Sequence, residues 1–277
     1  MVTGLRVTVI MKINSVVNPD YNILSIQVSL DGFSFYIENE LLQSRLSEEY
    51  IAFSEAFTPE KTLEEIQKIF EKFSELKEPF KKVNVVYHNE LYAFVPATLF
   101  DENHLTDYLK YNTKILKTDF AVYDEIKKHD LVNVFIPFAN INNFFFDNFG
   151  SFTYNHGMSI LVNAILDKAA IDGQNRMVAH VGQSTFDLVV YKDNNLLLGN
   201  TFSYTSPEDF LYYILFCAEQ LDLNPDEVEL ELIGNIEEGD ALHTIIYTYV
   251  RNISIQSSSE KTNSKFKRNS FFIEHLD

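Results

Sequence analysis

The sequence has little of several things, and each shortage excludes a class of protein. A single cysteine, Cys217, rules out an internal disulfide bond, and we expect it to be a small buried residue of a helix. The longest apolar run, FLYYILFCA at 210–218, is far shorter than the roughly 20 residues of a membrane-spanning helix. The N-terminal MVTGLRVTVIMKI is broken by Arg6 and Lys12 and lacks a small-residue cleavage site, so it is not a signal peptide pattern. We therefore expect a cytoplasmic protein without direct membrane insertion.

Basic residues are also scarce. The chain has 22 Lys and Arg against 40 Asp and Glu, which gives a formal net charge of −18. A field of that sign repels phosphate backbones and anionic lipid headgroups. We therefore expect no nucleic acid among its partners.

Familiar catalytic and metal-binding motifs are missing as well. The seven histidines show no HxxxH spacing and the chain has no CxxC, so we expect no metal site. No GxSxG elbow, Walker loop or GxGxxG motif follows a predicted strand, and we therefore assign no catalytic residue. Neighbouring carboxylates such as Glu64-Glu65 and Glu237-Glu238 are typical of solvated helix faces.

What the chain does contain is a pattern that occurs twice. Its 277 residues are 46% hydrophobic, enough for one large core or two smaller ones. The segments 23–45 and 177–201 both read as three short strands joined by two tight turns, with Gln27 aligned on His180. Apolar alternation and turn residues recur at similar places in both, and a helix and a further strand follow each. The sequence therefore predicts a duplicated β-β-β-α-β unit.

Further elements are predicted along the chain. Thr58-Pro59 opens a helix to about residue 76, and Ser206, with Pro207 in the first turn, caps another to about residue 221. The short polar segment 171–175 is the expected boundary, so we assign a first lobe to 11–170, a second lobe to 171–256 and a polar tail to 257–277. The other expected helices are 102–112, 140–149, 159–170 and 238–248, and the other expected strands are 83–88, 91–100, 132–138, 151–155, 228–234 and 250–256.

Two halves of this type resemble the actin-like ATPase fold shared by actin, Hsp70 and sugar kinases. The segment VAHVGQSTFDLVVYKDNNLLLGNTF is similar to the second-half hairpins of the cytoplasmic actin-like proteins of type IV pilus and type II secretion platforms. SIQVSLDGFSFYI, AFVPATLF and the order of elements resemble an uncharacterised Bacteroidota family of unknown function. The resemblance implies an α/β, duplicated, actin-like (ribonuclease H-like) two-lobed fold. It names a fold and not an activity.

The resemblance also implies a site that can be checked by residue. In actin-like ATPases an Asp ends the first strand of each half, and two glycine-rich turns face each other across a cleft to hold phosphates and Mg²⁺. Here the Asp positions carry Gln27 and His180. We expect a degenerate nucleotide cleft formed by a set of eight residues: Gln27, Ser29, His180, Gly182, Ser184, Thr185, Gly234 and Asn235.

Without the two carboxylates, we expect a non-catalytic or vestigial module that acts as a cytoplasmic protein-interaction scaffold, with an unidentified protein partner and no cofactor. One alternative is an ATPase or small-molecule kinase with atypical phosphate motifs, and only this reading requires ATP and Mg²⁺. Another alternative is a small-ligand sensor that uses the interlobe cleft.

The first residues allow a simple prediction. The resemblance begins only after Met11, so deletion of residues 1–10 should change the melting temperature by no more than a few degrees. A larger decrease in a thermal unfolding experiment would mean that these residues form part of the folded core.

Overall fold

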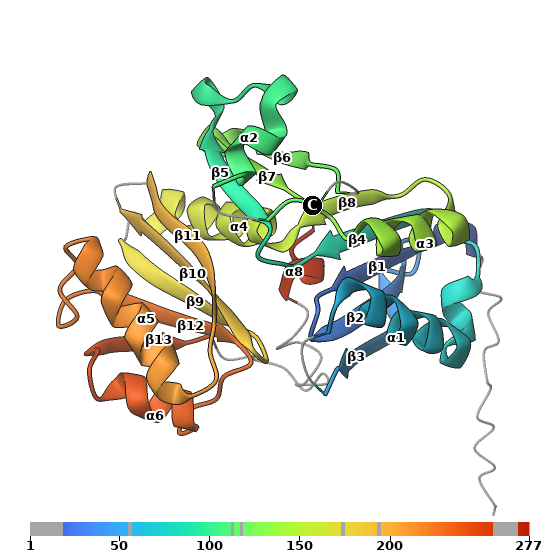
Figure 1. Ribbon diagram of the computed structural model, residues 1–277. Helices are drawn as coiled ribbons and strands as arrows, with labels where there is room; N and C mark the ends of the chain where they lie inside the picture. The colour runs from blue at the N-terminus through green and yellow to red at the C-terminus, as the bar shows by residue number, and fades with distance from the viewer. Residues whose placement is uncertain are drawn as a thin grey trace, which may run out of the picture.

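The computed structural model describes residues 19–54, 57–111, 114–116, 119–172, 175–192, 195–256 and 271–276. These residues form two five-stranded sheets, a three-stranded sheet and the helices that cover them (Figure 1). The predicted α/β organisation is confirmed. The prediction for residues 1–10 falls outside the described residues.

The first sheet has the strand order β3-β2-β1-β4-β8. Its first three strands are antiparallel neighbours, as the alternation and turns predict, whereas β4 and β8 continue parallel to β1. We call the part of the molecule built on this sheet the first lobe. Its strands are β1 (Asn22–Val28), β2 (Gly32–Asn39), β3 (Ser44–Ala52), β4 (Lys82–Tyr87) and β8 (Thr153–His156).

Helices cover both faces of the first sheet. Phe35 of β2 packs edge-on against Phe73 at the end of α1, with ring centroids 5.4 Å apart. The next residue, Tyr36, points to the opposite face because side chains alternate along a strand. There its hydroxyl donates a 3.0 Å hydrogen bond to the carbonyl of Ile273 in α8. The helices are α1 (Pro59–Lys72), α3 (Ala139–Phe149), which packs on α1, and α8 (Phe271–Glu274).

The second sheet repeats the arrangement, with the order β11-β10-β9-β12-β13 and the same succession of antiparallel and parallel pairs. Phe186 and Leu188 of β10 pack with Phe210 of α5 on the outer face. We call this part the second lobe. It contains β9 (Arg176–Val181), β10 (Thr185–Lys192), β11 (Asn195–Ser203), α5 (Pro207–Gln220), β12 (Glu229–Gly234), α6 (Ala241–Tyr247) and β13 (Asn252–Ile255).

The two long outer helices begin where their caps predict. The Thr58 side chain accepts a hydrogen bond from the Lys61 amide ahead of α1, and Pro59 occupies the first turn. Ser206 and Asp209 form a reciprocal capping box ahead of α5. These side chains use amide groups that a helix start leaves unpaired.

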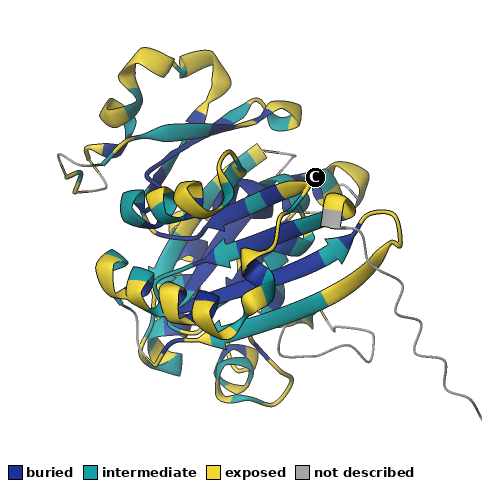
Figure 2. Ribbon diagram, turned by 90° about the vertical axis from the view of Figure 1, so that its right-hand side faces the viewer, coloured by how far each residue is buried: buried dark blue, intermediate teal, exposed yellow. Residues whose placement is uncertain are grey.

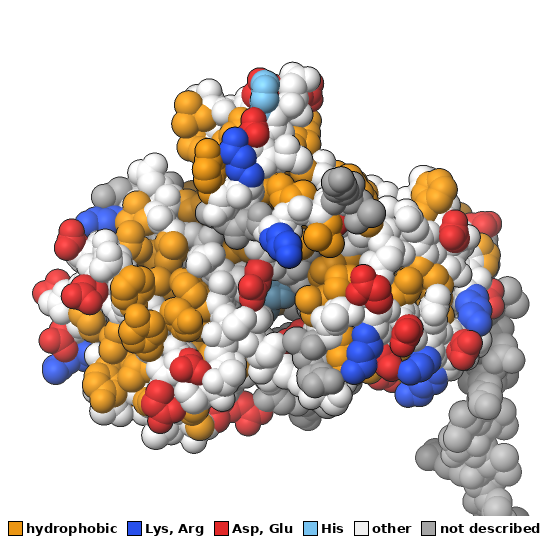
Figure 3. Space-filling model, viewed as in Figure 1, with side chains coloured by type: hydrophobic (Ala, Val, Ile, Leu, Met, Phe, Trp, Pro, Cys, Tyr) orange, Lys and Arg blue, Asp and Glu red, His pale blue; other side chains and the backbone are white. Residues whose placement is uncertain are grey.

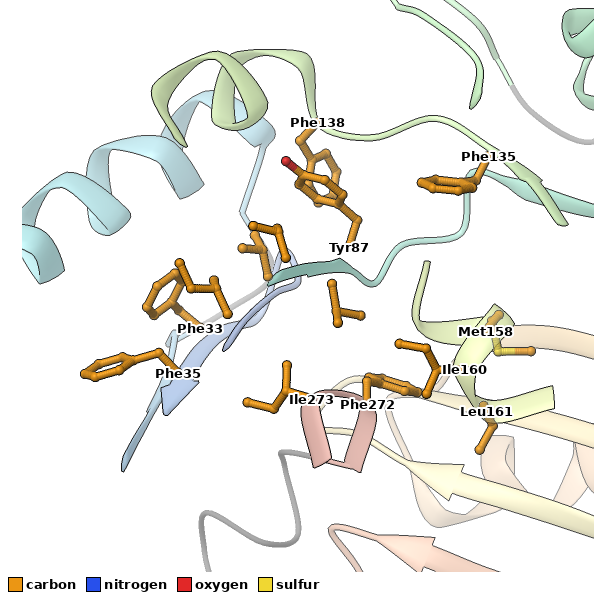
Figure 4. Close-up of a cluster of buried hydrophobic side chains, with 14 of the residues drawn as sticks. Phe33, Phe35, Tyr87, Phe135, Phe138, Met158, Ile160, Leu161, Phe272 and Ile273 are labelled. Carbon is orange, nitrogen blue, oxygen red and sulfur yellow. The ribbon is translucent and has the colours of Figure 1, made fainter. Parts of the chain in front are cut away.

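The inner faces of the two sheets share one hydrophobic core. Val189 and Tyr191 of β10 belong to the same buried cluster as Val86 of β4, and α4 (Gly157–Asp172) contacts both sheets. Figure 4 shows Met158, Ile160 and Leu161 of α4 beside Phe272 and Ile273 of α8 in this cluster, and Figure 2 shows the buried strands beneath exposed helices. The boundary predicted after residue 170 falls inside the last turn of α4.

The three-stranded sheet is an insertion between β4 and β8, with the order β5-β7-β6. It reaches the second lobe through Phe94, because a Cβ on Gly199 of β11 would lie only 2.8 Å from the Phe94 ring. The strand β6 was not predicted from the sequence, and the helix predicted over 102–112 is shorter. The elements are β5 (Tyr92–Pro96), α2 (Leu105–Leu109), β6 (Val122–Ile126) and β7 (Leu131–Phe135).

Residues 271–276 differ from the polar tail that was predicted for them. The polar tail assigned to 257–277 includes residues 271–276, and within them Phe272 and Ile273 are fully buried against the first lobe. This segment is apolar at its centre and returns from the second lobe to the first. No helix among the described residues is long and apolar enough to cross a membrane.

Candidate functional site

The two turns that the resemblance places opposite each other are in direct contact. In the β1–β2 turn, Ser29 Oγ donates to Asp31 Oδ1 at 2.6 Å. In the β9–β10 turn, Ser184 Oγ donates to the other oxygen of Asp31, Oδ2, at 2.8 Å. Next to it, Gln183 Nε2 donates to the Phe53 carbonyl at 3.0 Å. The structure therefore brings the predicted residues Ser29 and Ser184 together, with Asp31 between them.

Gly182 and Thr185 close the second turn on itself. The Gly182 amide donates to the Thr185 carbonyl at 2.8 Å, and the Tyr204 hydroxyl donates to the Gly182 carbonyl at 3.0 Å. A Cβ at position 182 would lie 2.9 Å from the Thr185 carbonyl oxygen, so the turn requires glycine. A phosphate cradle needs free backbone amides. At Gly182 that amide is already used within the turn.

Gly234 and Asn235 follow β12 and pack against the end of β9. Gly234 has a φ of 90°, and a Cβ there would lie 2.5 Å from the Val181 carbonyl oxygen. The Asn235 amide donates to the same carbonyl at 2.7 Å, and its side chain is exposed. The glycine is thus required by a tight backbone crossing beside His180, independently of any ligand.

The two positions where the resemblance expects aspartates lie on β1 and β9. Gln27 is half-buried, and its Oε1 is buried without a hydrogen-bond partner in the described part of the chain. His180 is buried, and its Nδ1 lies 3.1 Å from Asp187 Oδ2. Because an ionised carboxylate only accepts, His180 Nδ1 is the donor. His180 is thus held by a side chain that the sequence analysis did not select.

Asp187 of β10 is the centre of a buried polar cluster. His88, which follows β4, places Nε2 3.0 and 2.9 Å from its two carboxylate oxygens. Thr201 of β11 donates to Asp187 Oδ1 at 2.7 Å, and the Tyr92 hydroxyl lies 3.0 Å from the Thr201 hydroxyl. The cluster therefore joins both five-stranded sheets and the three-stranded sheet at one point.

The His88–Asp187 contact is an ion pair when His88 is protonated. Burial alone would raise the pKa of Asp187, but the charge of His88 and the hydrogen bonds from His180 and His88 hold that pKa well below its usual range. Burial alone would lower the pKa of His88, but the charge of Asp187 and the hydrogen bond to it raise that pKa above its usual value. By contrast, burial and the charge of His88 lower the pKa of His156 to about 3, so its ring is neutral.

Helix α8 covers this cluster. The Phe272 ring lies 4.8 Å from the His88 ring and 4.6 Å from the His180 ring, measured between centroids. On the same helix, Glu274 forms a 3.0 Å ion pair with Arg45 of β3. Through these contacts, α8 packs on residues of both lobes. Within the described residues, no three His, Cys, Asp or Glu side chains are placed to hold a metal ion.

Of the predicted residues, Ser184 contacts the opposite lobe and His180 contacts the buried cluster. Gln27 lies within β1, and the other five lie in or next to the turns. Sequence reasoning missed Asp187, His88 and Phe272. The signals available were a lone acid within the apolar strand TFDLVVYK and the apolar FFI that follows the polar segment. Figure 3 shows that the surface is hollowed between the lobes, with a histidine visible at the bottom.

The chain matches one protein family and several solved structures. The family described as "Protein of unknown function (DUF3822)" matches residues 12–253. No curated protein matches the chain. Among solved structures, a Bacteroides thetaiotaomicron protein with actin-like ATPase fold and unknown function is 23% identical and has a TM-score of 0.76, over 86% of this chain and 91% of that one.

Two further solved structures are more distant. The PilM-PilN type IV pilus biogenesis complex has a TM-score of 0.54 at 10% identity, over 92% of this chain and 97% of that one. The cytoplasmic domain of EpsL, an inner membrane component of the type II secretion system of Vibrio cholerae, has a TM-score of 0.45 at 11% identity, over 87% of each chain. The likenesses to the Bacteroides thetaiotaomicron protein and to the PilM-PilN complex show a two-lobed, actin-like fold.

Proposed function

Because the chain belongs to the family described as protein of unknown function (DUF3822) and has an actin-like fold, we propose that it is a protein-interaction scaffold without catalytic nucleotide chemistry. We place it in the cytoplasm and assign its lobes to residues 11–170 and 171–256, with the C-terminal α8 as part of the first lobe. Its partner is a protein, and it requires no cofactor.

The observation that carries the proposal is the hydrogen bond from Ser184 Oγ to Asp31 Oδ2, 2.8 Å long. In an actin-like ATPase the phosphates lie between these two turns. The Ser184 hydroxyl therefore donates its proton to Asp31 and is not available to a phosphate. Asp31 also places a carboxylate where a nucleotide would place its own negative charge, and the two would repel each other.

The replaced aspartates support the same proposal. Mg²⁺ is usually anchored by at least one protein carboxylate, and Gln27 supplies none. His180 is engaged with Asp187 and covered by Phe272. The PilM-PilN type IV pilus biogenesis complex is an assembly that contains this type of fold, which supports a scaffold role for this chain.

The proposal predicts the outcome of a nucleotide titration. Calorimetry with Mg²⁺ in excess should give no saturable heat for wild-type protein up to about 1 mM ATP, which corresponds to a binding free energy weaker than about −4 kcal/mol. Low-micromolar binding accompanied by hydrolysis would replace the scaffold proposal with the atypical ATPase.

A double reversion, Gln27→Asp with His180→Asp, is the informative variant. It restores both expected carboxylates but places the second beside Asp187, where like charges repel. We therefore expect a lower melting temperature and still no nucleotide binding. Recovery of Mg·ATP binding by this variant alone would mean that the site kept its ancestral shape. Affinity purification from native cells, with the tag at the N-terminus, tests the partner directly.

A further inference from the structure

Helix α5 carries an aromatic stripe on its outer side. One face of the helix is buried against the second sheet through Phe210 and Ile214. On the opposite side, the residue Tyr212 is 60% exposed and Phe216 is 43% exposed. Their rings stack at 5.8 Å between centroids with an interplanar angle of 18°. The spacing of four residues places them one turn apart, so they form a single continuous surface.

The aromatic surface extends beyond these two rings. Half-buried Tyr213 packs against Tyr212 at 5.4 Å and stacks on Phe202 of β11 at 4.7 Å, so the rings are supported from the sheet below. Figure 3 shows hydrophobic side chains gathered over α5, with carboxylates at their margin. A contiguous aromatic patch of this kind on a folded surface typically marks a contact site.

The charged residues at the ends of the aromatic stripe indicate the kind of partner that it contacts. Glu208 lies one turn before Tyr212, Glu219 lies one turn after Phe216, and both are exposed. Between Lys192 and Arg251 the chain contains twelve Asp and Glu and no Lys or Arg. Glu208 and Glu219 therefore lie in a stretch of the sequence that contains no Lys or Arg.

This chemistry selects a cationic and partly apolar occupant. Carboxylates at both ends of the stripe repel nucleic acid and anionic lipid, whereas they attract Lys and Arg. The faces of exposed aromatic rings bind the same cations, and the alkyl stems of Lys and Arg pack on such rings. A protein segment with basic residues around an apolar centre satisfies every part of the surface.

We propose that the outer face of α5, defined by Glu208, Tyr212, Phe216 and Glu219, docks a Lys- or Arg-bearing segment of a partner protein. This inference rests on the proposed scaffold function and names the surface and the chemistry of the partner. The two carboxylates lie eleven positions apart in the sequence, which corresponds to about 16 Å along a helix. The partner therefore presents basic residues about three helical turns apart, with apolar residues between them.

The experiment uses a synthetic helical peptide as the probe, with Lys at two positions eleven residues apart and two Leu between them. We expect fluorescence anisotropy to show binding to the full chain, and binding should weaken when salt rises from about 50 to 300 mM because screening increases. Tyr212→Ser with Phe216→Ser should weaken binding at least about tenfold, as for central aromatic contacts. Tyr247→Ser with Tyr249→Ser, which removes exposed aromatics outside the stripe, is the matched control and should bind as wild type.

Three outcomes would overturn the inference. The first is no binding to wild type, and the second is equal binding to the stripe variant or by a peptide with Glu in place of Lys. The third concerns the chain's own basic residues at 265, 267 and 268. Much tighter probe binding by Lys265→Glu with Lys267→Glu and Arg268→Glu would identify that segment as the occupant. Nucleotide binding would end the scaffold proposal without changing any of these readouts, so the two failures are distinguishable.

Discussion

Asp187→Ala protein should lose about 3–5 kcal/mol of its free energy of unfolding, as for other buried ion pairs that lose one partner. The carboxylate is fully buried and accepts hydrogen bonds from His88, His180 and Thr201. Its removal leaves the His88 charge uncompensated in the interior and unpairs the other two donors. Urea unfolding followed by circular dichroism measures the difference.

The matched control is Asp107→Ala, which removes an exposed ion pair with Lys110. Exposed pairs contribute about 0–1 kcal/mol, so this variant should unfold nearly as wild type. A loss below about 1 kcal/mol for Asp187→Ala would contradict the view that the cluster joins the lobes.

The same ion pair gives stability a pH dependence. Because the pKa of His88 is raised, its contribution is complete below the unfolded value near 6.5 and is lost as the pH rises through the folded value. Because the pKa of Asp187 is lowered, its contribution is complete above the unfolded value near 3.8 and is lost only in stronger acid. The advantage of wild type over Asp187→Asn should therefore shrink above pH 6.5.

Phe272→Ala should lower the free energy of unfolding by about 3–5 kcal/mol, as for other large buried aromatics. The ring is fully buried and covers both His88 and His180, so truncation leaves a cavity at the junction of the lobes. We also expect protease cleavage between the lobes to become faster, because α8 no longer holds them together. Chemical unfolding and limited proteolysis measure the two effects.

Its neighbour provides the control. Phe271 is only partly buried and stacks on His275 at 4.0 Å, so Phe271→Ala should cost clearly less. Equal losses for the two variants would mean that α8 is held by general hydrophobic contact and that the ring over the histidines has no special role.

Strand patterns and helix caps were sufficient to predict most of the fold. Alternation in SIQVSLDGFSFYI and STFDLVVYK identifies β1, β2 and β10, and Ser206-Pro207 identifies the start of α5. The strand β6, VYDEI, was missed because its central Asp and Glu interrupt the apolar pattern. Its Asp124 is nevertheless buried, where it accepts a hydrogen bond from the His156 amide.

The candidate site was predicted less well, and the reason is physical. Alternation places Phe186 and Leu188 of β10 on one face and Asp187 on the other, which for a half-exposed sheet would mean solvent. Here the second face is covered by α4, α8 and the first lobe, so Asp187 is buried on it. A pattern within one strand contains no information about what covers its far side. The partners of Asp187, separated from it by up to 99 residues, depend on tertiary structure alone.

The position of α8 links an early and a late part of the chain. A ribosome completes β1 and β4 long before it reaches residues 271–276, yet α8 packs on both of these strands and bonds to Tyr36 of β2. The apolar surface of the first lobe that α8 covers therefore stays exposed while the second lobe is synthesised. A stop codon introduced before residue 271 would consequently expose apolar surface in the part of the protein that was translated first.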